Sequence, residues 1–323
     1  MNSELLRVED LKVWFDIKRG LLSKPVYVRA VDGVSFTFNL GESISLVGES
    51  GSGKTTLGKT ILRLYKPTGG RIIFEGKDIT DNESGDMKWY RRETALVQQD
   101  PFGALPPHFN IYRILEEPLI INNIGTREER REIIYKAMEE VRLTPVEDFA
   151  PKYPHMISGG QMQRVVIARA LIMRPKLVVA DEPVSMLDAS VRVEILELLR
   201  GMQEKYNTNL IYITHDLATV RMFSHWIFIM YAGEMVERAL TRELLSDPLH
   251  PYTNALLNAI PEPDPENRNI IKEVPPGEPP DLVNPPPGCR FAPRCARVMD
   301  LCKEKPPELE IKERHWVKCW LYK

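Results

Sequence analysis

The stretch Gly48–Thr55 reads GESGSGKT and directly follows the apolar run SISLV at Ser43–Val47. The helix-forming residues TLGKTILRL come immediately after it. This is the pattern G-x-x-x-x-G-K-[ST] in a strand–loop–helix context, in which backbone N–H groups and a helix N-terminus surround phosphate oxygens. We expect Lys54 to reach the β- and γ-phosphates of a nucleotide, and the Thr55 hydroxyl to bind Mg²⁺. The residues expected to surround the phosphates are Gly48, Glu49, Ser50, Gly51, Ser52, Gly53, Lys54, Thr55 and Thr56.

A pair of acidic residues ends a second apolar run, LVVADEP, at Leu177–Pro183. A carboxylate at the end of such a strand can hold Mg²⁺ opposite the phosphate loop, which predicts this role for Asp181. Glu182 follows it and is placed to act as general base on the attacking water. A strand that ends in Asp-Glu is common by itself, so this prediction depends on the phosphate loop upstream.

Composition and charge restrict the class of protein. The chain has 323 residues, 43% of them hydrophobic and 27% charged, which is typical of a soluble globular protein of about two domains. Its 43 basic and 45 acidic residues nearly balance, which argues against a nucleic-acid partner. No apolar run approaches the roughly 18–20 residues that cross a bilayer, and the opening MNSELLRVEDLKVWF lacks the plan of a signal peptide. We therefore expect a cytoplasmic location.

The character of the sequence changes along the chain. Short alternating or apolar runs such as VSFTFNL and LIYITHD predict strands, and TREERREIIYKAMEEVRL predicts an amphipathic helix with a capping box at Thr126 and Glu129. Strands that alternate with helices indicate an α/β fold with a largely parallel sheet. Residues 261–307 contain 13 of the 26 prolines and predict an extended linker. We expect a domain at 1–260, with a helical insert at about 100–170, and a tail at 261–323.

A third motif, ISGGQMQR at Ile157–Arg164, resembles the LSGGQ signature of ABC-transporter ATPases. Other elements of that family match in order. Gln99 in VQQDP resembles the Q-loop glutamine, although the adjacent Gln98 is an alternative. SMLD at Ser185–Asp188 resembles the D-loop. His215 in ITHD resembles the switch histidine. Without the family, Ser158 would be read as a helix N-cap and His215 as a structural histidine.

The resemblance implies a fold and a mechanism. The fold is an ABC-type phosphate-loop ATPase core with a mixed or parallel sheet, an antiparallel β subdomain and a helical subdomain. Two ATP molecules lie between two such subunits, and each is held by the phosphate loop of one and the signature of the other. The implied signature contacts are Ser158, Gly159, Gly160 and Gln161; the implied catalytic residues are Glu182, His215 and Gln99; the implied Mg²⁺ ligands are Thr55, Gln99 and Asp181.

An aromatic residue that stacks on adenine is also implied by the family. Tyr27 is the best-placed candidate, since it lies upstream of the phosphate loop. Trp14 and Phe15 lie in a strand-like run and are predicted to be core residues.

Four further segments identify a branch of the family. AVDGVSF, YPHMISGGQMQRVVIARAL, DEPVSMLD and HPYTNALL resemble the ATPases of oligopeptide and dipeptide transporters, as does the tail GCRFAPRC. This branch implies a second homologous ATPase chain (a homodimer being possible in isolation), two transmembrane permease chains and, indirectly, an extracellular binding protein. It also implies a peripheral location on the cytoplasmic face of the membrane. The cargo would be oligopeptides or dipeptides, with oligosaccharides possible; a non-transport ABC ATPase and a non-hydrolysing regulatory ATP-binding module are the alternatives.

All four cysteines, Cys289, Cys295, Cys302 and Cys319, lie in the tail. Disulfides are disfavoured in a reducing compartment, and unligated buried thiols remain an alternative. A four-thiolate metal site is the preferred hypothesis, although no C-x-x-C pair typical of zinc is present. The resemblance implies a four-iron iron–sulfur cluster, with zinc as the alternative. Because the tail lies outside every ATP motif, we expect this metal site to have a structural role.

Overall fold

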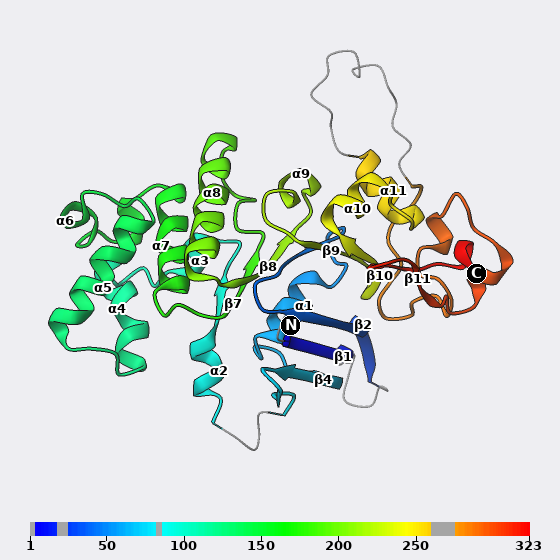
Figure 1. Cartoon of the computed structure of the whole chain (residues 1–323), viewed down its shortest axis with the longest axis horizontal. Helices are drawn as coiled ribbons and strands as arrows, with labels where there is room; N and C mark the ends of the chain where they lie inside the picture. Colours follow the sequence, from blue (N-terminus) through cyan, green and yellow to red (C-terminus); the bar gives the residue numbers. More distant parts are fainter. Residues whose placement is uncertain (1–3, 18–24, 82–85, 260–274) are drawn as a thin grey trace, which may run out of the picture. The chain divides into compact units, whose positions relative to one another are not determined.

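The computed structural model describes residues 4–17, 25–81, 86–259 and 275–323 (Figure 1). The chain divides into two compact units, one formed by Met1–Glu83 with Tyr212–Lys323 and the other by Ser84–Ile211. Each unit combines segments of strand and helix, and each is described by itself below.

An antiparallel sheet in the first unit has the strand order β2-β1-β4-β5. Its strands are β1 (Glu4–Ile17), β2 (Val26–Asn39), β4 (Gly69–Phe74) and β5 (Lys77–Asp78), and Figure 1 shows β1, β2 and β4 together near the N-terminus. In β2, alternate side chains are buried, because successive residues of a strand point to opposite faces. The alternation in VSFTFNL therefore predicted this strand and its buried face correctly.

The other strands of the first unit include a mixed set in the order β11-β12-β10-β9-β3. They are β3 (Ser43–Val47), β9 (Trp226–Tyr231), β10 (Glu234–Leu240), β11 (Glu308–Lys312) and β12 (His315–Lys318). Strands β3 and β9 are parallel, whereas β9–β10, β10–β12 and β11–β12 are antiparallel. The tail therefore supplies two strands to this sheet.

Short helices complete the first unit: α1 (Lys54–Ile61), α9 (Leu217–Val220), α10 (Thr241–Ser246) and α11 (Pro251–Asn258). Its core joins residues that are distant in the sequence, since Val47, Ile229, Tyr252 and the tail residue Phe291 belong to one buried cluster. The tail is thus packed into the core of this unit and is not an independent appendage.

The second unit contains one parallel strand pair and most of the helices. Strands β6 (Thr94–Val97) and β7 (Leu177–Asp181) are parallel. Its helices are α2 (Lys88–Glu93), α3 (Pro101–Ala104), α4 (Ile111–Ile121), α5 (Arg127–Glu140), α6 (Val146–Phe149), α7 (Gly159–Leu171) and α8 (Ala189–Tyr206), with a 3-10 turn at Pro154–Met156. Strand β8 (Asn209–Thr214) begins in this unit and ends in the first.

The predicted amphipathic helix is confirmed as α5, and both hydrogen bonds of the Thr126–Glu129 capping box are present. One prediction is wrong: Phe15 is 39% exposed and contacts Tyr65 edge-on, because alternate burial stops at the last residues of β1. Trp14 is only partly buried. The boundary expected at 260–261, and the linker residues up to 274, lie outside the described residues.

Within the described residues, no helix has both the length and the apolar character needed to span a membrane.

Candidate active site

The phosphate loop lies between β3 and α1, as its sequence predicts. Lys54 is only 5% exposed, and its ammonium group folds back over the loop. Its Nζ donates to the carbonyl oxygens of Gly48 and Glu49 at 2.7 and 2.9 Å and lies 3.4 Å from the Ser52 hydroxyl. A positive charge is therefore held in the loop where anionic phosphates would bind.

Gly53 lies at the junction of the loop with α1, where only glycine fits. Its φ of 103° is rarely adopted by residues with a side chain, and a Cβ there would lie 2.1 Å from the Ala30 carbonyl oxygen. The loop is also bonded from outside, since the N–H of Gly233 donates to the Ser52 carbonyl at 2.9 Å. The backbone of the loop is thus fixed by tertiary contacts.

In the second unit, two predicted catalytic side chains meet. Asp181 ends β7 and is 6% exposed, and Glu182 follows with a φ of 44°. The Gln99 amide Nε2 donates to Glu182 Oε2 at 3.3 Å. Gln98 instead accepts a bond at its backbone carbonyl from Gln163, at 3.5 Å. Of the two candidate glutamines, Gln99 is the one whose side chain bonds the Glu182 carboxylate.

The signature forms the start of α7. Ser158 is exposed and caps this helix, because its Oγ accepts from the Gln161 N–H at 3.3 Å while Gln161 Oε1 accepts from the Ser158 N–H at 3.0 Å. The N-cap interpretation of Ser158 therefore holds, and it is compatible with a further role. A Cβ on Gly160 would lie 2.6 Å from a Val191 methyl of α8, so glycine lets the two helices approach closely.

His215 follows β8 in the first unit and is exposed. The next residue, Asp216, accepts from the Ala218 N–H at 2.9 Å and caps α9. In the predicted D-loop, the Ser185 hydroxyl donates to the Glu182 carbonyl at 3.1 Å. The predicted site residues are thus divided, with the phosphate loop, His215 and Tyr27 in the first unit and Gln99, Ser158–Gln161 and Asp181–Glu182 in the second.

Family models and known relatives agree with these motifs. A model described as ABC transporter matches residues 31–185, and one described as oligopeptide/dipeptide transporter, C-terminal region, matches residues 236–302. An oligopeptide transport ATP-binding protein of Bacillus subtilis, AppF, is 44% identical, with 98% of this chain and 97% of that protein covered. A dipeptide transport ATP-binding protein of Haemophilus influenzae, DppF, is 43% identical, with 96% and 94% covered. The chain belongs to the ABC transporter ATP-binding proteins of the oligopeptide/dipeptide type.

A solved structure supports the fold of this ABC ATPase. The ATP-binding cassette MJ0796, solved as a dimer bound to ADP and Pi, matches with a TM-score of 0.65 and 29% identity over 74% of this chain and 99% of that one. The expected ABC cassette fold, with its mixed α/β sheet, antiparallel sheet and helices, is therefore confirmed.

Tyr27 lies on β2 of this ABC ATPase and is 42% exposed. Its ring centroid is 6.3 Å from that of Trp14, at an interplanar angle of 48°. Trp14 is itself engaged, since its Nε1 donates to Asp32 at 3.2 Å and the Arg29 guanidinium lies 4.9 Å from its ring centroid. An exposed aromatic face at Tyr27 is compatible with stacking on a base.

The structure does not support the predicted metal site at the four cysteines. All four lie within the described residues as free thiols, and no group of three or more His, Cys, Asp or Glu in the described part of the chain could hold a metal ion. Burial raises the pKa of the Cys289 thiol to about 11. The structure thus supports neither an iron–sulfur cluster nor zinc.

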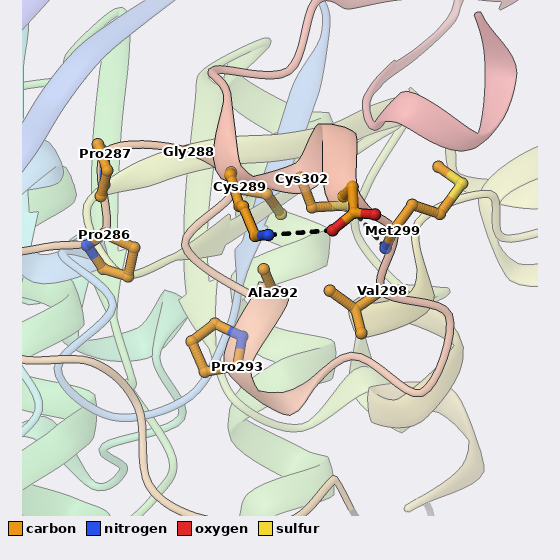
Figure 2. Close-up of a pocket in the computed structure, with 11 residues that line it drawn as sticks. Pro286, Pro287, Gly288, Cys289, Ala292, Pro293, Val298, Met299 and Cys302 are labelled. Carbon is orange, nitrogen blue, oxygen red and sulfur yellow. Dashed lines mark hydrogen bonds and ion pairs between the residues drawn. The ribbon is translucent and has the colours of Figure 1, made fainter.

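The surroundings of two of these thiols explain how the tail is held together. The Cys289 N–H donates to the Cys302 carbonyl at 2.9 Å, and both residues line the pocket that Figure 2 shows. Prolines and small residues surround this bond and leave a pocket of about 570 Å³, whose lining includes Pro286, Pro287, Gly288, Cys289, Ala292, Pro293 and Cys302. A backbone hydrogen bond therefore joins the two segments that carry Cys289 and Cys302.

Two groups that bond the phosphate loop were missed by the sequence analysis. The hydroxyl of Tyr252 accepts from the Glu49 N–H at 2.8 Å, and the Arg294 guanidinium bonds the Glu49 carboxylate. Tyr252 lies in HPYTNALL and Arg294 in GCRFAPRC, two segments that had served only as markers of the branch. Both segments resemble the family branch although they lie outside every ATP motif, and this resemblance could have suggested a contact with the site.

Proposed function

We propose that this chain is the ATP-hydrolysing subunit of a transporter that imports oligopeptides or dipeptides. The contact of Gln99 with the Glu182 carboxylate carries the proposal, because a module that only holds ATP needs no glutamine bonded to a general base. The names of the two relatives support peptides as cargo. Oligosaccharides remain a second cargo class, since this chain does not itself bind what is transported.

The phosphate loop would bind ATP through its backbone N–H groups and Lys54. The Lys54 ammonium, which bonds loop carbonyls, would turn to the β- and γ-phosphates. The Thr55 hydroxyl, the Asp181 carboxylate and the Gln99 amide oxygen are the hard oxygen donors that suit Mg²⁺, which when bound neutralises phosphate charge. Tyr27 would stack on the adenine ring.

Hydrolysis would depend on the pair at the end of β7. Glu182 would take a proton from the attacking water as general base, and the Gln99 amide, which donates to this carboxylate, would hold it in position. His215 would bond the γ-phosphate or the water from the far end of β8. The three side chains carry the acid–base and positioning steps that in-line attack requires.

The signature would complete the site of a second subunit. A helix of 13 residues begins at Gly159, with Ser158 as its N-cap. The Ser158 hydroxyl, the N–H groups of Gly159, Gly160 and Gln161 and the helix N-terminus would face an incoming γ-phosphate. We propose a homologous ATPase chain as the natural partner, with a homodimer possible in isolation. Two permease chains and an extracellular binding protein would complete the assembly at the cytoplasmic face of the membrane.

A groove in the second unit is a suitable docking site for a permease. It has a volume of about 270 Å³, and its lining includes Gln98, Ala104, Pro118, Arg169 and Met173. Phe102, on the same helix as Ala104, is 65% exposed. Because Gln98 adjoins Gln99, a permease segment in this groove would lie next to a catalytic residue and couple transport to hydrolysis.

The proposal covers ATP and Mg²⁺ and does not extend to a metal at the cysteines, because no metal-binding group is found among the described residues. It also keeps 1–260 as the ATPase domain and 261–323 as linker and tail, with a boundary outside the described residues.

Two variants test the proposed division of labour between subunits. Lys54→Ala should weaken ATP binding, whereas Ser158→Arg should bind ATP yet fail to form the ATP-bound dimer and fail to hydrolyse. Binding would be measured with a fluorescent ATP analogue and dimers by light scattering.

Specific activity of the unmodified chain should rise about tenfold from nanomolar to micromolar protein, because two chains build each site. A constant rate, or full activity of Ser158→Arg, would refute the proposal.

A further inference from the structure

A side chain from the cysteine-bearing tail directly contacts the phosphate loop. Arg294 Nη1 lies 3.2 and 2.9 Å from the two carboxylate oxygens of Glu49. The same guanidinium donates to the Tyr231 hydroxyl and to the Pro276 carbonyl, each at 3.3 Å. The Arg294 side chain is only 7% exposed, compared with 30% for Glu49. The arginine is therefore buried, multiply bonded and fixed in orientation.

The segment that carries Arg294 is held near the phosphate loop by packing between aromatic side chains. The ring centroid of Phe291 lies 5.2 Å from that of Tyr231 and 5.4 Å from that of Tyr252, and all three side chains are buried. The Tyr252 hydroxyl in turn accepts from the Glu49 N–H. Glu49 is thus held at its backbone by α11 and at its carboxylate by the tail.

A second arginine of the same segment supports the loop from another direction. Arg290, 5% exposed, forms an ion pair with Asp32 and donates to the Ala232 carbonyl. The next residue, Gly233, donates its N–H to the Ser52 carbonyl of the phosphate loop at 2.9 Å. GCRFAPRC therefore places one buried arginine on Glu49 of the loop and a second one on Ala232, the residue before Gly233.

The charge of Glu49 gives this arrangement its significance. A carboxylate inside a loop that binds polyphosphate repels the ligand, and the repulsion grows with the number of phosphate charges. Arg294 opposes that repulsion with a positive charge at hydrogen-bond distance, and its several acceptors keep the carboxylate in one position. Removal of the arginine would leave an unpaired negative charge beside the bound nucleotide.

We propose that Arg294 is a positioning residue for ATP binding, which acts by neutralising and orienting Glu49 of the phosphate loop. The inference rests on the proposed role of Gly48–Thr55 as the phosphate-binding loop. It gives the tail, which lies outside every ATP motif, a function in the nucleotide cycle.

The test compares nucleotide affinity in two backgrounds. Arg294→Met should raise the Kd for ATP about tenfold, with a smaller rise for ADP and the smallest for AMP. In a Glu49→Gln background, the same substitution should change the Kd for ATP less than about twofold, because the charge that needed neutralising is gone. Arg297→Met is the matched control, since Arg297 lies three residues further along the tail and is exposed. Its Kd should equal that of the parent chain.

The outcomes separate the possible explanations. An equal loss in both backgrounds, or an equal loss for ATP and AMP, would show that Arg294 only supports the fold and would overturn the inference. Arg294→Lys keeps the charge and should give an intermediate Kd, which provides a measurement if Arg294→Met does not fold. If Lys54→Ala leaves ATP binding intact, the phosphate-loop assignment itself fails; if Lys54→Ala weakens binding while folded Arg294→Met does not, only this inference fails.

Discussion

The two halves of the candidate site are built in different ways. In the first unit, the phosphate loop is bonded by Tyr252, Gly233 and Arg294, which lie far from it in the sequence. In the second unit, exposed Ser158 has its capping bonds with Gln161, only three residues away, and the exposed Gln99 bonds Glu182, which is 83 residues away. One half is fixed by tertiary structure, and the other presents its polar groups on a surface.

The difference agrees with what each half has to do. A phosphate loop works best when its N–H groups already point at the ligand, since no reorganisation is then needed on binding. A signature that completes a partner's site must remain accessible until the partner arrives. Perturbations of the first half should therefore alter stability and ATP affinity, and perturbations of the second should alter turnover and assembly.

The largest expected effect is on turnover and falls in the second half. Glu182→Gln should lower the rate of ATP hydrolysis at least ~10²-fold, because the general base is lost, while ATP binding is retained. The variant should also accumulate as an ATP-bound dimer. Steady-state hydrolysis and light scattering would check both results. If the variant hydrolyses ATP at the parent rate, Glu182 is not the base and His215 becomes the candidate.

A pH-dependent loss of stability is expected in the first half. His250 is buried, and burial lowers its pKa from 6.5 to about 4. Between these values the unfolded chain binds a proton that the folded chain does not, so stability falls as the pH is lowered from about 6.5 to 4. The linked contribution is roughly 3 kcal/mol. Denaturant unfolding at a series of pH values would measure it.

His250→Asn is the control for this titration. Nδ1 of His250 accepts from the Tyr252 N–H at 3.0 Å at the start of α11, and an asparagine oxygen can also cap a helix without titrating. The variant should have a flatter dependence of stability on pH over this range. Parallel curves for the two proteins would show that another group is responsible.

The smallest effect on the isolated chain is expected at the groove of the second half. Phe102→Asp should change the basal hydrolysis rate less than about twofold, since the side chain is exposed and lies outside the site residues. In the reconstituted transporter, however, permease-dependent stimulation should be lost. Leu64→Asp, at a side chain in the first unit that is 58% exposed, should leave both rates unchanged. Normal stimulation of Phe102→Asp would place the docking site elsewhere.

Local sequence patterns predicted the local features of this chain. The strand–loop–helix around Gly48–Thr55 and the capping box at Thr126 depend on interactions between residues a few positions apart. The local sequence is therefore sufficient to predict them. The contact between Glu49 and Arg294 spans 245 residues, and nothing in either segment alone specifies it. Tertiary packing decides such pairs.

The cysteines show a second limit. The spacing of Cys289, Cys295, Cys302 and Cys319 is compatible with a metal site, but spacing does not specify where four sulfur atoms point or how deeply each is buried. The apolar residues of β1, similarly, continue to the end of the strand. At Phe15, however, the buried core no longer covers them. Periodicity predicts a face, and the neighbouring elements determine whether that face is covered.

The backbone of Glu182 has a consequence for the evolution of such proteins. A φ of 44° is unfavourable for a residue with a side chain and costs on the order of 1 kcal/mol. Glycine would remove that cost at this position. A chain selected for stability alone would therefore tend to replace Glu182 and lose its carboxylate. A subunit that keeps glutamate here is less stable than a variant with glycine would be, and selection for ATP hydrolysis is the reason to keep it. Degenerate copies freed from that requirement should accumulate glycine or asparagine at this position early in their divergence.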